Sequence, residues 1–166
     1  LEERLHLEKI CHDELSDLYM LCKDKRAEEQ IGQCIDLHRK WLAMDDRFER
    51  PYRDTTGYMM RAYAKMVYLR DLISRDKLNE YYQKCIGLAR ARGDMAEIYS
   101  TSARYYQCTG DYERAVAYID STITAYKSKG IKADLAPIYA TQSYLYEKMG
   151  DYKNALKAVR TTNNIR

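Results

Sequence analysis

Four side chains in the first quarter of the chain have the chemistry to hold a metal ion. Cys34 and His38 are four residues apart, so a helix places them on the same face. If the helix before them folds back near residues 23–26, Cys11 and His12 lie level with His38. Two thiols and two imidazoles are a plausible ligand set for zinc. However, the spacing matches no known zinc motif, and burial on an apolar stripe explains Cys34 and His38 as well. We therefore predict no metal and no cofactor, and these four residues are the candidates for a metal site.

No other arrangement of residues indicates catalysis. The sequence has no glycine-rich loop for phosphate and no nucleophile elbow. Its carboxylates stand beside cationic residues, as in Glu147 with Lys148 or Asp111 with Arg114, which is typical of solvated helix faces. We expect no enzyme activity in this segment, and a kinase domain would have to lie outside it.

The composition favours helices and argues against two classes of partner. The 166 residues include 7 glycines and 2 prolines, and charged residues of both signs make up 32%. The formal net charge is +3 without a basic cluster, so we expect no direct binding of nucleic acid. No apolar stretch approaches the roughly 18 residues of a membrane span. The chain begins at Leu1 without a visible signal peptide, so we expect a fragment of a longer protein.

The elements that position these residues are indicated by a repeat in the second half. Seven or more positions recur at one offset of 40 residues, as Tyr99 does at Tyr139. The first copy contains Ile98, Tyr99, Tyr106, Gly110, Asp111, Tyr112 and Ala115, and the second contains Ile138, Tyr139, Tyr146, Gly150, Asp151, Tyr152 and Ala155.

Apolar residues at helical spacing fill the intervals between these landmarks. The stripes are Leu135, Ile138, Tyr139, Gln142, Leu145 and Tyr146; Tyr112, Ala115, Val116, Ile119, Ile123 and Tyr126; and Tyr152, Ala155, Leu156 and Val159. Gly110 and Gly150 fall between stripes, where glycine can close a helix in the left-handed conformation. The aspartate that follows can accept hydrogen bonds from the first N–H groups of the next helix. Each Gly-Asp-Tyr therefore predicts a tight turn between antiparallel helices, with the tyrosine packing across the pair.

With these residues, segments 96–122 and 136–162 resemble the tetratricopeptide repeat (TPR). That family has a large residue at the fourth position, an aromatic at the eleventh, Gly-x-Tyr at the turn and alanine at the twentieth. The matching residues are Tyr99, Tyr106, Gly110, Tyr112 and Ala115, together with Tyr139, Tyr146, Gly150, Tyr152 and Ala155. The family's Leu-Gly is replaced by Ser102-Ala103 and Gln142-Ser143, and its closing proline is absent. Longer second helices, running to about Ser128, explain a period of 40 in place of the usual ~34.

The first half follows the same plan on amphipathic pattern alone. Leu15, Leu18 and Cys22, with Cys11 before them, mark a first helix, and Ile31, Cys34, Ile35, His38 and Leu42 mark its partner. Residues 45–53, with Pro51, form a connector. Further helices are predicted over 55–69 and 77–91. We predict one all-α domain over 1–166, a right-handed α-α superhelix (solenoid) of about four TPR-like hairpins and eight helices. Its approximate repeats are 1–45, 53–92, 94–129 and 132–166.

The resemblance implies a concave surface, lined by the first helix of each repeat, that binds a protein or peptide. Its groove positions are Glu97, Ser100, Arg104 and Gln107 in one repeat, and Ala140, Tyr144, Glu147 and Lys148 in the next. Among the 17 tyrosines, Tyr144 is the one favoured for recognition, because tyrosine offers a rigid apolar face with a polar tip.

The long repeats resemble the TPR sensory region of bacterial signalling proteins, which precedes a histidine kinase or a helix-turn-helix regulator. That resemblance implies a role in signal transduction or transcription regulation. One alternative is a cytoplasmic peptide-pheromone receptor of the quorum-sensing type, and another is a purely structural scaffold. The receptor is disfavoured because no asparagine maps to the groove of the two clear repeats.

Two further expectations concern compartment and assembly. Five cysteines without a CxxC pair favour reduced thiols and hence the cytoplasm, whereas a membrane-anchored sensor would place the segment in the periplasm. No following repeat covers the final helix, so a homodimer through this end is expected to be possible.

Overall fold

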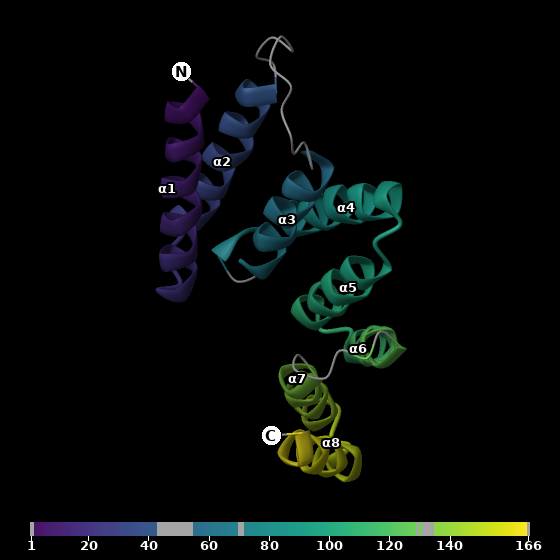
Figure 1. Ribbon diagram of the computed structural model, residues 1–166. Helices are drawn as coiled ribbons and strands as arrows, with labels where there is room; N and C mark the ends of the chain where they lie inside the picture. The colour runs from purple at the N-terminus through teal and green to yellow at the C-terminus, as the bar shows by residue number, and fades with distance from the viewer. Residues whose placement is uncertain (1, 43–54, 70–71, 129, 131–134, 166) are drawn as a thin grey trace. The chain divides into compact units, whose positions relative to one another are not determined.

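The computed structural model describes residues 2–42, 55–69, 72–128, 130 and 135–165 (Figure 1). Within these ranges it forms eight α-helices and no strand. The helices are α1 (Glu2–Leu21), α2 (Arg26–Leu42), α3 (Thr55–Tyr68), α4 (Arg75–Arg92), α5 (Met95–Thr109), α6 (Tyr112–Ser128), α7 (Leu135–Lys148) and α8 (Tyr152–Ile165). The prediction of an all-α protein built of helical hairpins is confirmed. The predicted connector at 45–53 lies outside the described residues.

The chain divides into two compact units, residues 1–88 and 89–166. The first contains α1, α2, α3 and most of α4, and the second contains α5 to α8. No helix in the described ranges is long and apolar enough to cross a membrane.

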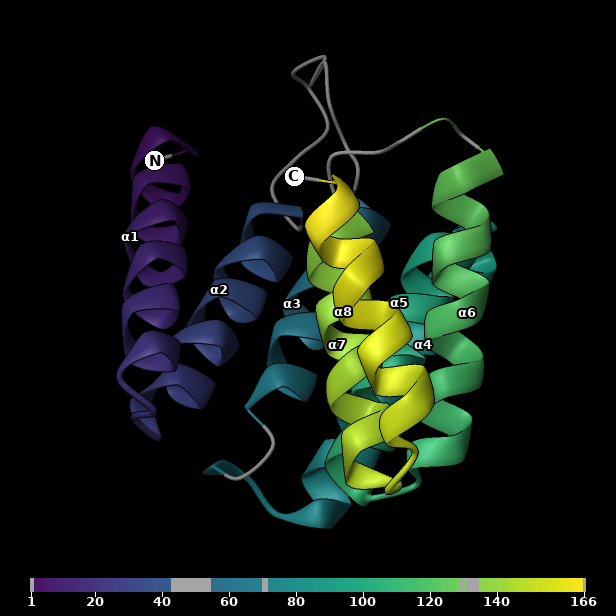
Figure 2. The ribbon, with the colours of Figure 1, turned by 90° about the horizontal axis from the view of Figure 1, so that it is seen from below.

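The core of the second unit joins both of its hairpins. Figures 1 and 2 both show α7 and α8 side by side. Helix α6 precedes them in the chain. The buried cluster combines residues of α5, α6 and α7: Ala103, Ala115, Val116, Ile119, Ile123, Leu135, Tyr139 and Leu145. Tyr112, Tyr126, Ile138 and Tyr146 pack against it. The stripes predicted for α6 and α7 are therefore the core-facing stripes.

Both Gly-Asp-Tyr turns have the predicted geometry. Gly110 and Gly150 have φ angles of +83° and +76°. The N–H of Asp111 donates to the carbonyl of Tyr106 at 3.0 Å, which closes the last turn of α5. At the start of α6, Asp111 Oδ1 accepts from the N–H of Arg114 at 3.2 Å. The equivalent carboxylate, Asp151, accepts from the N–H and side chain of Asn154, and these bonds lower its pKa.

The stripe predicted for α8 is only partly buried. Ala155 lies in the core, but Tyr152, Leu156 and Val159 are 71%, 52% and 41% exposed. The prediction that Tyr152 packs across the helix pair is therefore wrong. Its helix is held to α7 by a different face, which carries the buried Ala155, Ala158 and Thr162.

The stripe predicted for α1 also faces outward. Leu15 and Leu18 are 38% and 57% exposed, and Cys11 and Cys22 are exposed as well. The helix instead buries the opposite face, where Ser16 is fully buried. Amphipathic spacing located the helix correctly, but it assigned the wrong face to the core.

Polar contacts fix the register of α1 against α2. Cys34 Sγ donates to the carbonyl of Lys9 at 3.5 Å, and His12 Nδ1 lies 2.6 Å from Gln30 Oε1.

The ring of His38 stacks on Tyr58 of α3, with ring centroids 4.2 Å apart. His38 is 5% exposed, and burial together with the nearby Lys9 ammonium lowers its pKa to about 4.

An ion-pair cluster joins helices α1 and α3 of the first unit. Lys65 Nζ of α3 lies 2.6 Å from Asp13 Oδ1 and 2.8 Å from Asp17 Oδ1 of α1. Burial disfavours the Lys65 ammonium, but the hydrogen bonds that it donates to the two carboxylates outweigh burial and raise its pKa. This contact holds the first helices of the two hairpins in the first unit together.

One prediction tests the turn glycines by a matched pair of substitutions. Gly110→Ala should lower the free energy of unfolding by about 1 kcal/mol, because an alanine at a φ of +83° is strained. Gly87→Ala should raise it by about 1 kcal/mol, because Gly87 lies inside α4 with open space at its Cβ position. Chemical denaturation of the two variants measures both changes in the free energy of unfolding. A stabilised Gly110→Ala would contradict the turn geometry.

A second prediction concerns His38 and pH. Because its folded-state pKa of about 4 is below the ordinary value of 6.5, the unfolded chain binds this proton at a higher pH than the folded chain. The stabilisation is complete above about pH 6.5 and is lost as the pH falls towards 4, by at most about 3 kcal/mol. His38→Phe keeps the stacking on Tyr58 and should flatten the dependence of Tm on pH in this window. Equal slopes for wild type and variant would contradict a buried neutral histidine.

Candidate partner-binding surface

On α5 the predicted groove residues contact one another. Asp94 caps the helix by accepting from the N–H of Glu97 at 3.1 Å, and Ser100 Oγ donates to the Glu97 carbonyl at 3.3 Å. One turn later, Arg104 Nη1 donates to Gln107 Oε1 at 3.3 Å. All four predicted side chains are half-buried. The α5 face therefore offers a guanidinium–amide pair that is already oriented by its own helix.

On α7 the predicted residues are more open to solvent. Ala140, Tyr144 and Lys148 follow one another at intervals of one helical turn, so they share a face. Tyr144 is 40% exposed, and Lys148 Nζ lies 5.3 Å from the centre of its ring. This cation–π contact restricts the ring while leaving part of it accessible. Glu147 is exposed beside them.

The other faces of α7 explain why Tyr144 is held in place. Leu145 is fully buried, and Gln142 Nε2 donates to Asp120 Oδ1 of α6 at 2.6 Å. Ser143 Oγ donates to the Ala155 carbonyl of α8 at 3.1 Å. Contacts to both neighbouring helices thus fix the rotation of α7, and that rotation points Tyr144 outward.

A polar cleft lies on another side of α7, between α6 and α8. Its volume is about 520 Å³, and its lining residues are Asp120, Ile123, Thr124, Lys127, Tyr139, Gln142, Tyr146, Asn154, Lys157, Ala158 and Thr161. Lys127 Nζ lies 5.6 Å from the centre of the Tyr139 ring. Burial, with the nearby Asp120, raises the pKa of Tyr146. This cleft was not predictable from the sequence, because its polar residues come from three helices and share no spacing.

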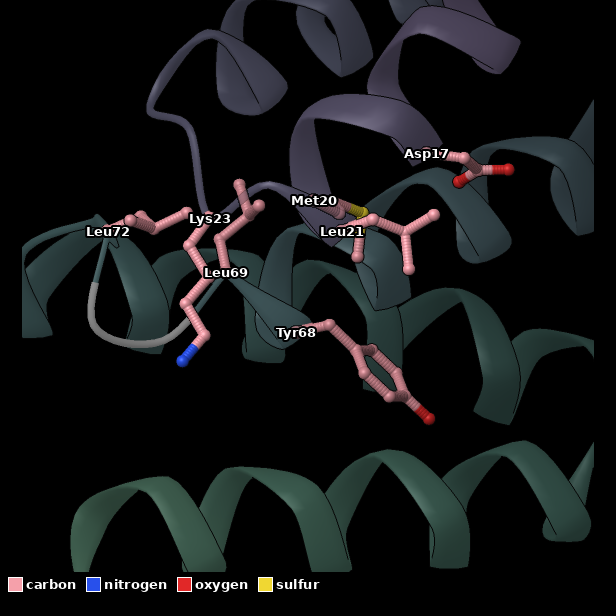
Figure 3. Close-up of a pocket in the computed structure, with 7 residues that line it drawn as sticks. All are labelled: Asp17, Met20, Leu21, Lys23, Tyr68, Leu69 and Leu72. Carbon is pink, nitrogen blue, oxygen red and sulfur yellow. The ribbon is translucent and has the colours of Figure 1, made fainter.

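The first unit has an apolar hollow where α1 and α3 end (Figure 3). Its volume is about 450 Å³, and it is lined by Asp17, Met20, Leu21, Lys23, Tyr68, Leu69 and Leu72. Leu21 is 82% exposed and Tyr68 is 45% exposed. Both helices are the first helices of their hairpins, so the hollow lies on the helices that the resemblance assigns to the partner surface. No sequence motif indicated it.

The structure does not bring the four metal candidates together. The register of Lys9 with Cys34 and of His12 with Gln30 places His38 level with residues before Lys9. The expected alignment of Cys11 and His12 with His38 is therefore wrong. Cys11 is exposed, and burial raises the pKa of the Cys34 thiol. Across the described residues, no group of three or more potential ligands could hold a metal ion.

Comparison with known proteins gives one family match. Residues 136–161 match the family described as tetratricopeptide repeat. This segment covers most of α7 and α8 and includes Tyr139, Tyr146, Gly150, Tyr152 and Ala155. No curated protein matches the chain.

One similar solved structure is the crystal structure of BtubC (BKLC) from P. vanneervenii. It is 14% identical, with a TM-score of 0.47, and the alignment covers 99% of this chain and 89% of that chain. A likeness of this extent carries no argument about function. The match to the tetratricopeptide repeat therefore concerns one hairpin of the chain, α7–α8.

Proposed function

We propose that this chain is a protein- or peptide-binding module whose partner contacts the face of α7 around Tyr144. The observation that carries the proposal is the half-exposed Tyr144 ring, held by Lys148 on the first helix of the segment that matches the repeat family. Tetratricopeptide repeats generally mediate protein binding, and a fixed aromatic ring with a polar tip is the kind of residue that dominates binding energy.

The predicted groove positions carry charges of both signs, so the two cations suit acidic side chains of a partner segment, and Glu97 and Glu147 suit basic ones. Lys148 and Arg104 supply two cations, and Gln107 supplies an amide that pairs with backbone or side-chain groups. The exposed part of the Tyr144 ring suits an apolar or aromatic side chain of the same segment. The chemistry is that of reversible recognition, without a group placed for a reaction.

We further propose that the module is the interaction or sensory region of a bacterial signal-transduction or transcription-regulatory protein. The support is the long period. First helices start 40 residues apart, at Met95 and Leu135, and second helices do so at Tyr112 and Tyr152. Sequencing the gene on both sides of this segment tests the assignment. We expect a histidine kinase or helix-turn-helix domain in the same polypeptide. Its absence would remove the signalling role and leave the binding module.

The binding surface is tested with peptides selected from a phage-displayed random library on the wild-type protein. Tyr144→Ala should weaken their binding at least about tenfold, because it removes a central aromatic contact. Tyr152→Ala is the matched control, since Tyr152 is an exposed tyrosine on the second helix of the same hairpin, and it should change affinity by less than about twofold. Fluorescence anisotropy at submicromolar protein measures both.

Arg104→Glu is a second probe of the same surface. This substitution should weaken the binding of acidic peptides more than the binding of neutral ones, because it reverses the charge of a predicted groove residue. Unchanged affinity in both Tyr144→Ala and Arg104→Glu would show that the selected peptides bind elsewhere. A library that yields no binder would favour a structural scaffold instead.

A further inference from the structure

The last helix exposes an apolar stripe. Tyr152, Leu156 and Val159 are spaced by four and three residues, so they share one face of α8. Their exposed fractions are 71%, 52% and 41%. A contiguous set of large apolar side chains facing water is characteristic of an interaction surface.

The internal repeat indicates which kind of helix fits against this stripe. At an offset of 40 residues, Leu156 corresponds to Val116 and Val159 corresponds to Ile119. Val116 and Ile119 are 8% and 6% exposed, in a cluster that includes Leu135 of the following first helix, α7. The same positions of the repeat are thus buried in one copy and exposed in the other. The stripe on α8 therefore has the pattern of a second helix that receives a first helix.

The first helix of the chain exposes a complementary stripe. Leu7, Ile10 and Leu18 are 61%, 41% and 57% exposed, on the side of α1 opposite the buried Ser16. The first helices α3 and α7 pack on the second helices that precede them, α2 and α6. In α1 the face opposite Ser16 carries these three exposed apolar residues. An exposed apolar helix face of this kind can dock on another helix.

Charge distinguishes among the possible pairings of these two stripes. Helix α8 carries three basic side chains and no acidic one, namely Lys153, Lys157 and Arg160. Helix α1 carries six acidic and two basic side chains. Pairing α8 with α8, or α1 with α1, would bring like charges together, whereas pairing α8 with α1 brings opposite charges together.

We propose that the α8 face of one copy of this chain binds the α1 face of a second copy, head to tail. Leu156 and Val159 of one copy then pack against Leu7 and Leu18 of the next, as Val116 and Ile119 pack in the cluster with α7. Each contact is heterologous, so an open assembly keeps one free α8 face and one free α1 face and can add further copies. The buried area is that of a single helix pair, which suits a weak association.

Complementation between two variants tests this arrangement by sedimentation velocity. The wild-type mass should rise with concentration through the micromolar range. Leu156→Glu and Leu18→Glu should each be monomeric alone, because each disables one end. Mixed in equal amounts, they should form a dimer and nothing larger, since one intact α8 face meets one intact α1 face. Ala117→Glu, at an exposed position of α6, is the control and should associate like the wild type. Circular dichroism verifies that each variant is folded.

Each alternative gives a different result in the same experiment. If α8 paired with α8, Leu18→Glu would still dimerise alone, and the proposal would be wrong. If these faces were covered only by another segment or by a different protein, the wild type would stay monomeric at every concentration, which also overturns it.

Charge reversal provides an independent readout of the same contact. Arg160→Glu and Glu14→Arg should each weaken association at least about tenfold on their own. An equal mixture of the two should recover it, because the reversed charges face each other at one of the two possible contacts. Equal weakening in the mixture and in the separate variants would contradict the pairing of α8 with α1.

Discussion

A pair of antiparallel helices in this chain cannot bury all of its apolar surface by itself, and most of the structure follows from that constraint. Helix α6 illustrates it, because the cluster that buries Val116 and Ile119 takes residues from α5 and also from α7. Each square ångström of apolar surface removed from water contributes about 25 cal/mol, so a hairpin gains substantially from a neighbour. The two hairpins of the second unit therefore share one core. The stripes of α1 and α8 are apolar faces that stay exposed in the described structure.

Polar contacts help to hold hairpins together where the repeat signature is weak. In the first unit, Glu28 Oε1 of α2 accepts from both Lys77 Nζ and Tyr81 OH of α4, each at 2.7 Å. Burial tends to raise the pKa of the Glu28 carboxyl, but these two hydrogen bonds outweigh it and lower the pKa. Partly exposed ion pairs of this kind add little net stability. Their geometry is directional, however, so they select one register among several that apolar packing alone would allow.

The parts of the fold that were predictable from sequence depend on short-range physics. A glycine that closes a helix and an aspartate that caps the next one act within a few residues, so Gly110 and Asp111 predicted the turn. The exposure of Leu156 was not predictable in this way, because helical spacing shows that a face is apolar but not whether another helix covers it. The register of α1 against α2 was also not predictable from the spacing of apolar residues. It is set by specific pairs such as His12 with Gln30, and an offset of a few residues separates His38 from Cys11. The cleft between α6 and α8 was missed for the same reason, since three separate helices build it.

The two proposed surfaces lie on different helices, and this separation has a functional consequence. Tyr144 is on α7, a first helix, whereas the apolar stripe is on α8, a second helix, so a partner at one does not occupy the other. If copies associate head to tail, each added copy contributes another Tyr144 surface to the same assembly. A partner with several copies of the recognised segment would then bind the array far more tightly than it binds one copy, because each further contact is intramolecular. Because association between copies is weak, this gain in affinity would depend on protein concentration. A change in the amount of this chain would then produce a steep change in the fraction of partner bound.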